Sequence, residues 1–559
     1  MDVADNPFPG LRPFEPHESA LYFGRDDQID ELLERLGGAR FLAVVGTSGS
    51  GKSSLVRAGL IPALHRGHLA GGGSRWRVAM FRPGDDPLGG LAQALGRPRD
   101  LIGQSSFGLV EAASTLDAGE KLLVIVDQFE ELFRVRQAGS EDGAAAFVKL
   151  LLRAAFEDGV AVYVVLTMRT DYLGACTVFR GLPEVLNGGQ YLIPRMTRDQ
   201  LTESIEGPVA VGGAAITPQL VQRLLNDVGD DPDQLPILQH ALMRTWSKGS
   251  EARAEGRPLE LDVPIYDAIG GMAGALNRHA EEAYEDVGKL PDGQRIARKL
   301  FQRLTEKGTE QQENRRPTSL AELCAVAEAD EQSVIAVIDK FRSQGRTFLT
   351  TPGASELTAD SVIDISHESL IRLWHRLSEW ADQEALSAER YRRLARAAEL
   401  HTKGEESPWR DPALQLALDW KNRERPNAAW AERYHTGFEE AMGFLEMSRK
   451  GREKSRRRGV RLTVALWLLT AGSVLATIYA AYMWKTAAAQ EALAEAQKLA
   501  AQSDFALKTS GRYLERSALL AVESMRRVHT VEGDRALRQS LSLARISHRW
   551  YGRRPYLVA

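Results

Sequence analysis

The chain has 559 residues, too many for one hydrophobic core, and this length predicts roughly three or four domains. Its net charge of -4 is small for that length, so charge alone indicates neither a nucleic-acid partner nor an acidic substrate. Two distant cysteines, Cys176 and Cys324, give no disulfide framework and indicate a reducing compartment for the segments that hold them.

The first segment, residues 1–23, is rich in proline and aromatic residues, and we expect it to form an extended N-terminal arm. The prolines at Pro7, Pro9 and Pro13 disfavour a helix there. A helical pattern of apolar residues begins only after Arg25.

Residues 24–196 predict an α/β region with a parallel sheet covered by helices on both faces. Apolar, strand-like runs alternate there with helical or loop segments, which is the pattern of buried parallel strands. The runs are Phe41–Val45, Trp76–Phe81, Leu122–Val126 and Val162–Thr167, with a weaker one at Tyr191–Ile193.

A complete phosphate-binding loop lies between the first run and a helix-forming stretch, Ser54–Ile61. Glycines let consecutive backbone N–H groups point at one spot, and the helix N-terminus adds a partial positive charge there. Lys52 can then reach the β- and γ-phosphates of a nucleotide, and the hydroxyl of Ser53 can bind Mg²⁺. The nucleotide-binding residues expected here are Gly46, Thr47, Ser48, Gly49, Ser50, Gly51, Lys52, Ser53 and Ser54.

The third run ends in an acid, Asp127, where P-loop NTPases place their second Mg²⁺ contact. The alternative for Asp127 is a strand-end cap. Hydrolysis also needs a group that orients or deprotonates the attacking water. The next residue is Gln128, so we expect Glu130 or Glu131 to take that proton, or Gln128 to position the water without accepting its proton. The alternative for the two glutamates is that they are charges favoured at a helix N-terminus.

The fourth run is followed by Arg169, whose place at a strand tip suits contact with the γ-phosphate. We expect Arg169 to report the presence of that phosphate. The alternative is a structural turn contact between Arg169 and Asp171.

Strand signals fade after residue 196, and residues 197–290 predict a helical region. Over residues 291–382, three helical segments precede two strand-like runs, Thr347–Thr350 and Val362–Ile365, which we expect to pair across Pro352-Gly353. This order is typical of a winged-helix domain. Locally, Pro236 either packs on an adenine ring or starts a helix, and His367 either touches a phosphate or is structural.

The remaining sequence predicts helices and one membrane span. Residues 383–459 are mostly helical and end in a basic run, Arg449–Arg458. Residues 460–484 hold Arg461 as their only charge, and about 20 residues of helix span roughly 30 Å, enough for a bilayer core. The basic run places the N-terminal side in the cytoplasm. Residues 485–559 form a helical C-terminal segment. The alternative to a membrane span at residues 460–484 is a buried core helix beside a basic nucleic-acid arm.

Four motifs in this order resemble those of the novel STAND NTPases, which are signal-transduction ATPases with numerous domains. The motifs are Asn6–Phe14, Phe23-Gly24-Arg25, the phosphate-binding loop and Val126–Glu131. The resemblance covers roughly residues 6–380. It implies a core that binds ATP or ADP, a helical lid and a winged-helix domain that closes over the nucleotide.

The resemblance also implies roles for single residues. Phe23, Gly24 and Arg25 are expected near the base, Pro236 near the adenine ring, and His367 at the β-phosphate of ADP in the closed state. The winged-helix domain then acts as a latch and need not bind DNA. Members of this group often carry a sensor after the membrane span. This sequence stops at Ala559 without a propeller pattern, so we expect that the sensor is absent or that the chain is a truncated product.

We therefore expect a slow ATPase that serves as a switch at the cell membrane. ADP would hold a closed monomer, and ATP would favour an open form that assembles with further copies and engages an unidentified effector or sensor protein. A DNA-binding regulator is a second interpretation, which the acidic residues Asp330, Glu331 and Asp339 disfavour. A membrane scaffold with a vestigial NTPase is a third.

Overall fold

A computed structural model describes most of the chain, which forms two compact units. The first unit contains residues 1–407 and 411–445, and the second contains residues 408–410 and 446–559. The described residues are 6–133, 141–229, 234–252, 258–307, 313–343, 345–351, 356–509 and 513–550.

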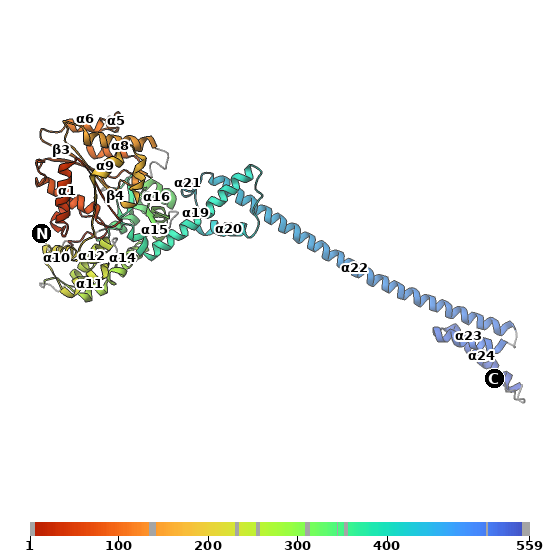
Figure 1. The fold of residues 1–559 in the computed structure, drawn as a ribbon. Helices are drawn as coiled ribbons and strands as arrows, with labels where there is room; N and C mark the ends of the chain where they lie inside the picture. Colours follow the sequence, from red (N-terminus) through yellow and green to blue (C-terminus); the bar gives the residue numbers. More distant parts are fainter. Residues whose placement is uncertain are drawn as a thin grey trace. The chain divides into compact units, whose positions relative to one another are not determined.

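The first unit begins with an α/β region built on a parallel sheet of five strands (Figure 1). The strand order is β2-β3-β4-β1-β5, so β4 lies between the two strands that lead to the phosphate-binding loop and to Asp127. The predicted parallel α/β core is therefore confirmed. The strands are β1 (Phe41–Gly46), β2 (Trp76–Phe81), β3 (Lys121–Val126), β4 (Val162–Arg169) and β5 (Gln190–Leu192).

Helices cover both faces of this sheet, and successive strand residues face opposite ways. On β3, Val124 and Val126 join a cluster with residues of α4 (Pro87–Leu95), α6 (Gly108–Ser114) and α8 (Glu141–Phe156). Its intervening residues Leu123 and Ile125 join a second cluster, with residues of α1 (Asp26–Gly38) and of the helix after the phosphate-binding loop. Burial on both faces explains the continuous apolar runs in the sequence.

The helix after the phosphate-binding loop departs from the predicted regular helix at Ser54–Ile61. It begins as α2 (Lys52–Ser54), continues as a π-helical stretch at Leu55–Leu60 and ends as α3 (Ile61–His65). π-helical turns occur frequently at functional sites, and an apolar periodicity does not distinguish them from α-helix.

The described residues between 197 and 290 are mostly helical, as predicted, and pack around a cluster that includes Trp246 and Tyr266. They also contain one short pair of parallel strands, β6 (Ala215–Ile216) and β7 (Glu260–Leu261). One helix, α14, contributes Met272 and Ala275 to this cluster and its later residues to the next one, so it joins the two regions. The helices are α10 (Arg198–Val211), α11 (Pro218–Val228), α12 (Gln234–Ala252), α13 (Val263–Ala268) and α14 (Gly271–Val287).

Residues 291–382, named here the third region, contain the expected three helices and a small antiparallel sheet. The sheet has the order β10-β12-β11, and β11 pairs with β12 as predicted. The turn expected at Pro352-Gly353 lies outside the described residues. The elements are α15 (Gly293–Leu304), β8 (Thr305–Lys307), β9 (Glu313–Arg315), β10 (Thr318–Ser319), α16 (Leu320–Ala327), α17 (Glu331–Arg342), β11 (Leu349–Thr350), β12 (Val362–Ile365) and α18 (Ser369–Leu373).

Helices α19 (His375–Thr402), α20 (Ala413–Glu424) and α21 (Ala428–Glu432) complete the first unit. Their contacts centre on the rings of Tyr391, Trp420 and Trp430.

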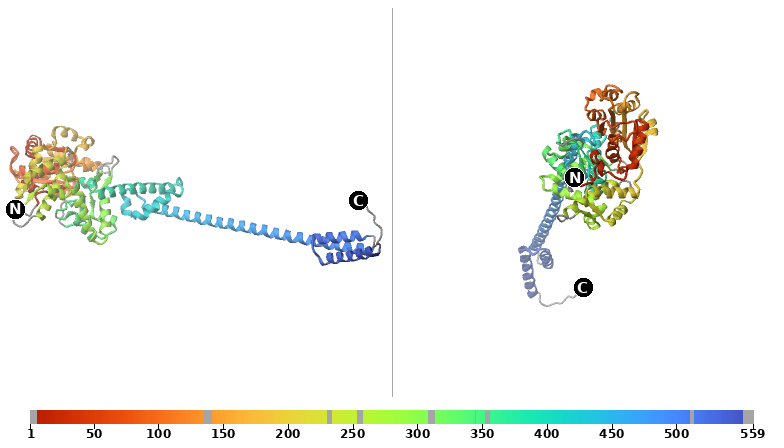
Figure 2. Two further views of the ribbon diagram at one scale, coloured as in Figure 1. Left: turned by 90° about the horizontal axis from the view of Figure 1, so that it is seen from below. Right: turned by 90° about the vertical axis from the view of Figure 1, so that its left-hand side faces the viewer.

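The second unit is helical and contains a candidate membrane span. Helix α22 (Phe438–Thr509) starts at the end of the first unit, and among the described residues it is the one helix long and apolar enough to cross a membrane. The predicted span, residues 460–484, lies inside it with its side chains exposed. Helices α23 (Leu514–Arg527) and α24 (Val531–Trp550) pack beside the end of α22 (Figure 2), where the serine hydroxyls of Ser503, Ser517 and Ser540 form a buried chain.

Candidate functional site

The carboxyl ends of four neighbouring strands bring chemically active residues to one edge of the sheet. Gly46 ends β1, Arg82 follows β2, Asp127 follows β3, and Arg169 ends β4. Ligands of open α/β sheets bind at this edge. The sheet topology therefore gathers residues that are far apart in the sequence.

The phosphate-binding loop folds as its glycines predict. Gly49 and Gly51 have φ angles of 72° and 88°, a left-handed conformation that favours glycine. A Cβ on Gly46 would lie 2.4 Å from a side-chain carbon of Ile193, so close packing also requires glycine there. The Lys52 ammonium donates to the backbone oxygens of Gly46 and Thr47, and burial lowers its pKa.

Asp127 and Ser53 lie together, as a Mg²⁺ site requires. The Ser53 hydroxyl donates to Oδ1 of Asp127 at 2.7 Å, and the hydroxyl of Thr167 donates to the same oxygen. Burial opposes ionisation of Asp127, but the charges of Arg57 and Arg82 and these hydrogen bonds hold its pKa below the ordinary value. A carboxylate beside a hydroxyl fits Mg²⁺, which commonly takes one or two protein ligands and completes its shell with water and phosphate oxygens.

The two glutamates after Asp127 lie in different surroundings. Glu130 lines the pocket around the phosphate-binding loop, and burial raises its pKa to about 7. Its Oε2 is buried without a hydrogen-bond partner among the described residues. In contrast, Oε2 of Glu131 accepts from the backbone N–H of Gly84 at 3.1 Å.

Gln128, the third candidate, is held in a left-handed backbone conformation with φ of 59°. Its backbone N–H donates to the hydroxyl of Thr167, and its side-chain oxygen accepts from Arg315 at 3.3 Å. Of the three side chains, Glu130 thus has the surroundings of a general base, whose best pKa lies near the working pH.

A carboxylate of the third region reaches the phosphate-binding loop. Oε2 of Glu368 accepts from the Ser48 hydroxyl at 2.9 Å, and its carboxylate also accepts from Arg169 at 3.0 Å. Arg169 makes the alternative contact with Asp171 as well, at 2.5 Å. Burial opposes ionisation of Glu368, but Arg315 and Arg169 hold its pKa below the ordinary value.

A second ionic bridge joins the same two regions. Oδ2 of Asp364, at the end of β12, accepts from Arg315 at 2.9 Å and from Arg82 at 3.2 Å. Asp364 is 1% exposed, so loss of either guanidinium group would leave this buried carboxylate with one ionic partner fewer.

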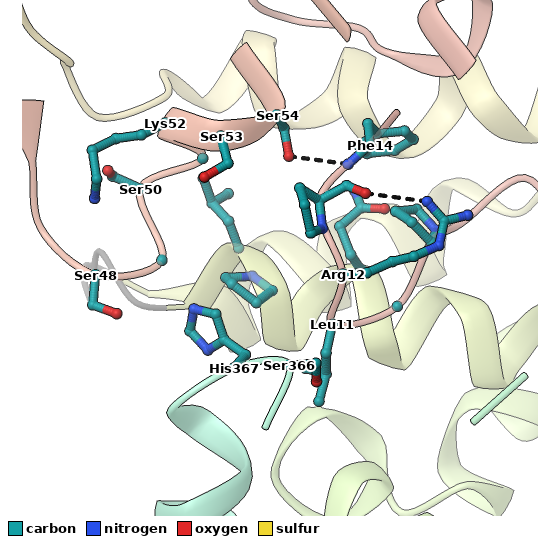
Figure 3. Close-up of a pocket in the computed structure, with 18 of the residues that line it drawn as sticks. Leu11, Arg12, Phe14, Ser48, Ser50, Lys52, Ser53, Ser54, Ser366 and His367 are labelled. Atoms are coloured by element: carbon teal, nitrogen blue, oxygen red, sulfur yellow. Dashed lines mark hydrogen bonds between the residues drawn. The ribbon is translucent and has the colours of Figure 1, made fainter. Parts of the chain in front are cut away.

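His367 and Pro236 line the same pocket as the phosphate-binding loop. Figure 3 shows His367 beneath the loop, on the side of the third region. Burial lowers the pKa of His367 to about 3, so its ring is neutral at neutral pH. Its Nδ1 lies 2.8 Å from the Ser369 hydroxyl, which leaves Nε2 for another contact. The structure thus brings both residues to the site, and their phosphate and adenine contacts stay predictions.

The segment Phe23-Gly24-Arg25 also reaches the site. Phe23 and Arg25 line the pocket, and the buried Arg25 guanidinium donates to the backbone oxygens of Pro194 and Ser50. Gly24 has a φ of 78°, and a Cβ there would lie 2.3 Å from the backbone oxygen of Gln200. Arg25 therefore braces the phosphate-binding loop, while Gly24 allows close approach of α10.

Four contributors to the site were not predicted from the sequence: Arg57, Arg82, Arg315 and Glu368. Arg82 follows a predicted strand, so the strand-end rule that found Asp127 and Arg169 also applies to it. Glu368 stands beside His367 in the sequence. Arg57 lies on the π-helical stretch, and Arg315 lies on the short strand β9, and neither carries a signal of its own.

One comparison with known proteins identifies a family. The model of a family described as Novel STAND NTPase 1 matches residues 7–408. No curated protein matches the chain.

Solved structures with some similarity include Cdc6p from Pyrobaculum aerophilum, at 14% identity and a TM-score of 0.30 over 64% of this chain and 94% of that one. The Aeropyrum pernix ORC2 protein with ADPNP and ADP has 13% identity and a TM-score of 0.39 over 65% and 94%. The Thermotoga maritima RuvB Holliday junction branch migration motor has 13% identity and a TM-score of 0.28 over 65% and 97%. TM-scores this low carry no inference about fold or function.

Proposed function

Because the chain belongs to the novel STAND NTPase 1 family, we propose that it is a switch controlled by ATP and ADP and tethered to the cell membrane. In this proposal the third region is a winged-helix latch, and residues 197–290 are a helical lid. ADP favours the closed form, and ATP favours an open form that assembles with further copies.

The contact between Glu368 and the phosphate-binding loop carries this proposal. Ser48 and Arg169 both belong to the α/β region. Both donate hydrogen bonds to the carboxylate of Glu368, which belongs to the third region. Arg169 is also the residue expected to bind the γ-phosphate. The latch and the γ-phosphate therefore compete for one guanidinium group.

Electrostatic repulsion determines which nucleotide opens the latch. A γ-phosphate near Ser48 and Arg169 would face the carboxylate of Glu368, and like charges at short range in a partly buried site repel. ADP lacks that phosphate and leaves the latch contact in place. A ligand shifts a conformational equilibrium only through its differential contacts with the two forms, and this contact provides such a difference.

Hydrolysis of ATP resets the switch in this proposal. Ser53 and Asp127 would hold Mg²⁺, which neutralises charge on the phosphates. Glu130 accepts the proton of the attacking water, because its pKa of about 7 lets it ionise near neutral pH and still take up a proton. Lys52 contacts the phosphates from the loop.

The membrane tether rests on residues 460–484 and the preceding basic run. Residues 449–458 carry seven Lys or Arg side chains and one acidic residue, Glu453. Such an asymmetry places the N-terminal side of a span in the cytoplasm. The latch then works at the cytoplasmic face of the membrane.

Two experiments test this function. Mass photometry of the full chain is expected to show monomers with ADP and larger assemblies with a slowly hydrolysed ATP analogue, and one assembly state with both nucleotides would contradict the switch. Lys52→Ala should abolish nucleotide binding, and retained binding would exclude the loop as the site.

If the chain is a membrane scaffold with a vestigial NTPase, no ATP hydrolysis is expected. ATP hydrolysis that disappears in Asp127→Asn would exclude that interpretation. Helix α17 does not favour a DNA-binding regulator, because its N-cap Asp330 and its first residue Glu331 carry charges that repel a phosphate backbone.

A further inference from the structure

The N-terminal arm contacts the α/β region, residues 197–290 and the third region. The Asn6 side chain donates to the backbone oxygen of Met243 on α12 at 2.8 Å. Phe8 is 3% exposed and belongs to the hydrophobic cluster of residues 197–275, where its ring meets Trp246 edge to face. Leu11, three residues later, is buried in the cluster of the third region. The arm is therefore fixed to both regions that cover the α/β core.

The following residues fix the arm to the core itself. The backbone N–H of Phe14 donates to the hydroxyl of Ser54, directly after the phosphate-binding loop, at 3.2 Å. Oε1 of Glu15 accepts from Arg57 at 2.7 Å, and the same guanidinium donates to Asp127 at 3.0 Å. The Arg57 side chain thus links the arm to Asp127, the expected Mg²⁺ ligand.

Between these fixed points the arm forms one wall of the pocket. Residues Leu11, Arg12, Pro13 and Phe14 line it together with the phosphate-binding loop. Figure 3 shows Leu11, Arg12 and Phe14 on the side of the pocket opposite Ser48 and Lys52. The arm turns at Gly10, where φ is 73° and a Cβ would lie 2.9 Å from the sulfur of Met243, so the turn requires glycine.

The chemistry of this wall suits a nucleoside better than a phosphate. It also includes Tyr22 and Phe23 at the end of the arm, and Met196 and Pro236 from other segments, all with apolar surfaces. Binding pockets for bases combine such surfaces with few polar groups. Among the polar groups that line the pocket, the side-chain Oε1 of Gln239 is buried without a hydrogen-bond partner among the described residues.

We propose that residues 11–14 of the arm contact the base and sugar of the bound nucleotide and transmit that contact to the lid and the latch. This inference rests on the proposed nucleotide switch. Since Leu11 is buried in the third region, movement of that region withdraws the arm from the nucleoside. Opening of the latch and release of ADP are then one event.

Isothermal titration of the full chain in detergent with ADP and with pyrophosphate tests this role. Phe14→Ala removes a ring from the wall and should weaken ADP binding roughly tenfold, while pyrophosphate binding changes less than about twofold. His17→Ala is the matched control, because His17 is exposed on the same arm and does not line the pocket. Equal losses for both ligands, or none for either, would overturn the proposal.

Hydrogen exchange of the unmodified protein gives an independent result if Phe14→Ala does not fold. ADP should slow exchange of the amides of Gly10, Leu11, Arg12 and Phe14, whereas pyrophosphate should not. Equal exchange with and without ADP would overturn the proposal. Lys52→Ala distinguishes failure of the arm's proposed role from failure of the proposed nucleotide site, since it should weaken the binding of both ADP and pyrophosphate. If it weakens neither, the phosphate-binding loop itself is not the site.

Discussion

Glu368→Gln tests the latch directly, because it removes one charge and keeps the size of the side chain. The carboxylate of Glu368 holds Arg169 at 3.0 and 3.2 Å and the Ser48 hydroxyl at 2.9 Å. Hydrogen bonds to charged groups contribute about 1.5–3 kcal/mol, and glutamine retains one acceptor oxygen. We therefore expect the closed form to lose about 1.5 kcal/mol, which corresponds to about tenfold in an equilibrium constant.

The assay is competition of ADP and a slowly hydrolysed ATP analogue against a fluorescent nucleotide on the full chain. The affinity ratio of the ATP analogue to ADP should rise about tenfold in Glu368→Gln, since the γ-phosphate no longer meets a like charge. Asp171→Asn is the matched control, because Asp171 also holds Arg169 but belongs to the α/β region. A ratio that is unchanged in Glu368→Gln, or that moves equally in both variants, would refute this reasoning.

Four further predictions concern Glu130 and Asp127. Glu130→Gln should lower the rate of ATP hydrolysis by roughly 100-fold or more while nucleotide affinity is kept, and a rate within twofold of the unmodified protein would exclude Glu130 as the base. Because the working base is the ionised carboxylate with a pKa of about 7, the hydrolysis rate should rise between about pH 6 and 8, and this rise should vanish in the residual activity of Glu130→Gln. The folded pKa of Glu130 lies above its ordinary value of 4.5, so ionisation destabilises the fold increasingly as the pH rises from 4.5 through 7. Glu130→Gln should thus raise Tm more at pH 8 than at pH 5, and equal changes would contradict the burial argument. Asp127→Asn should abolish the dependence of ATP binding on Mg²⁺, which titrations with Mg²⁺ and with EDTA would show.

The α/β core was predictable because its signals are local. A buried parallel strand is a continuous apolar run, and the five runs correspond to β1–β5 with small shifts at their ends. The phosphate-binding loop and Asp127 follow such runs directly. The strand-end rule also covers Arg82, which the motif pattern alone did not indicate.

The individual contacts between regions were not predictable from local patterns. Ser48 and Glu368 are 320 residues apart. The family resemblance implied that the neighbouring His367 lies near the phosphates, but no local pattern indicated that Glu368 itself contacts the loop. Strands β8, β9 and β10 have two or three residues each, too few to show an alternating pattern. The π-helical stretch at Leu55–Leu60 has the same apolar spacing as an α-helix over so few residues. Tertiary packing, rather than local propensity, decides each of these features.

The distance between the α/β region and the third region is the most direct measure of the latch. Spin labels at Glu34 on α1 and Glu331 on α17, both exposed, report this distance by pulsed electron resonance once Cys176 and Cys324 are replaced. The proposed switch predicts one narrow, short distance distribution with ADP and a longer one with a slowly hydrolysed ATP analogue. The same distribution with both nucleotides would contradict it.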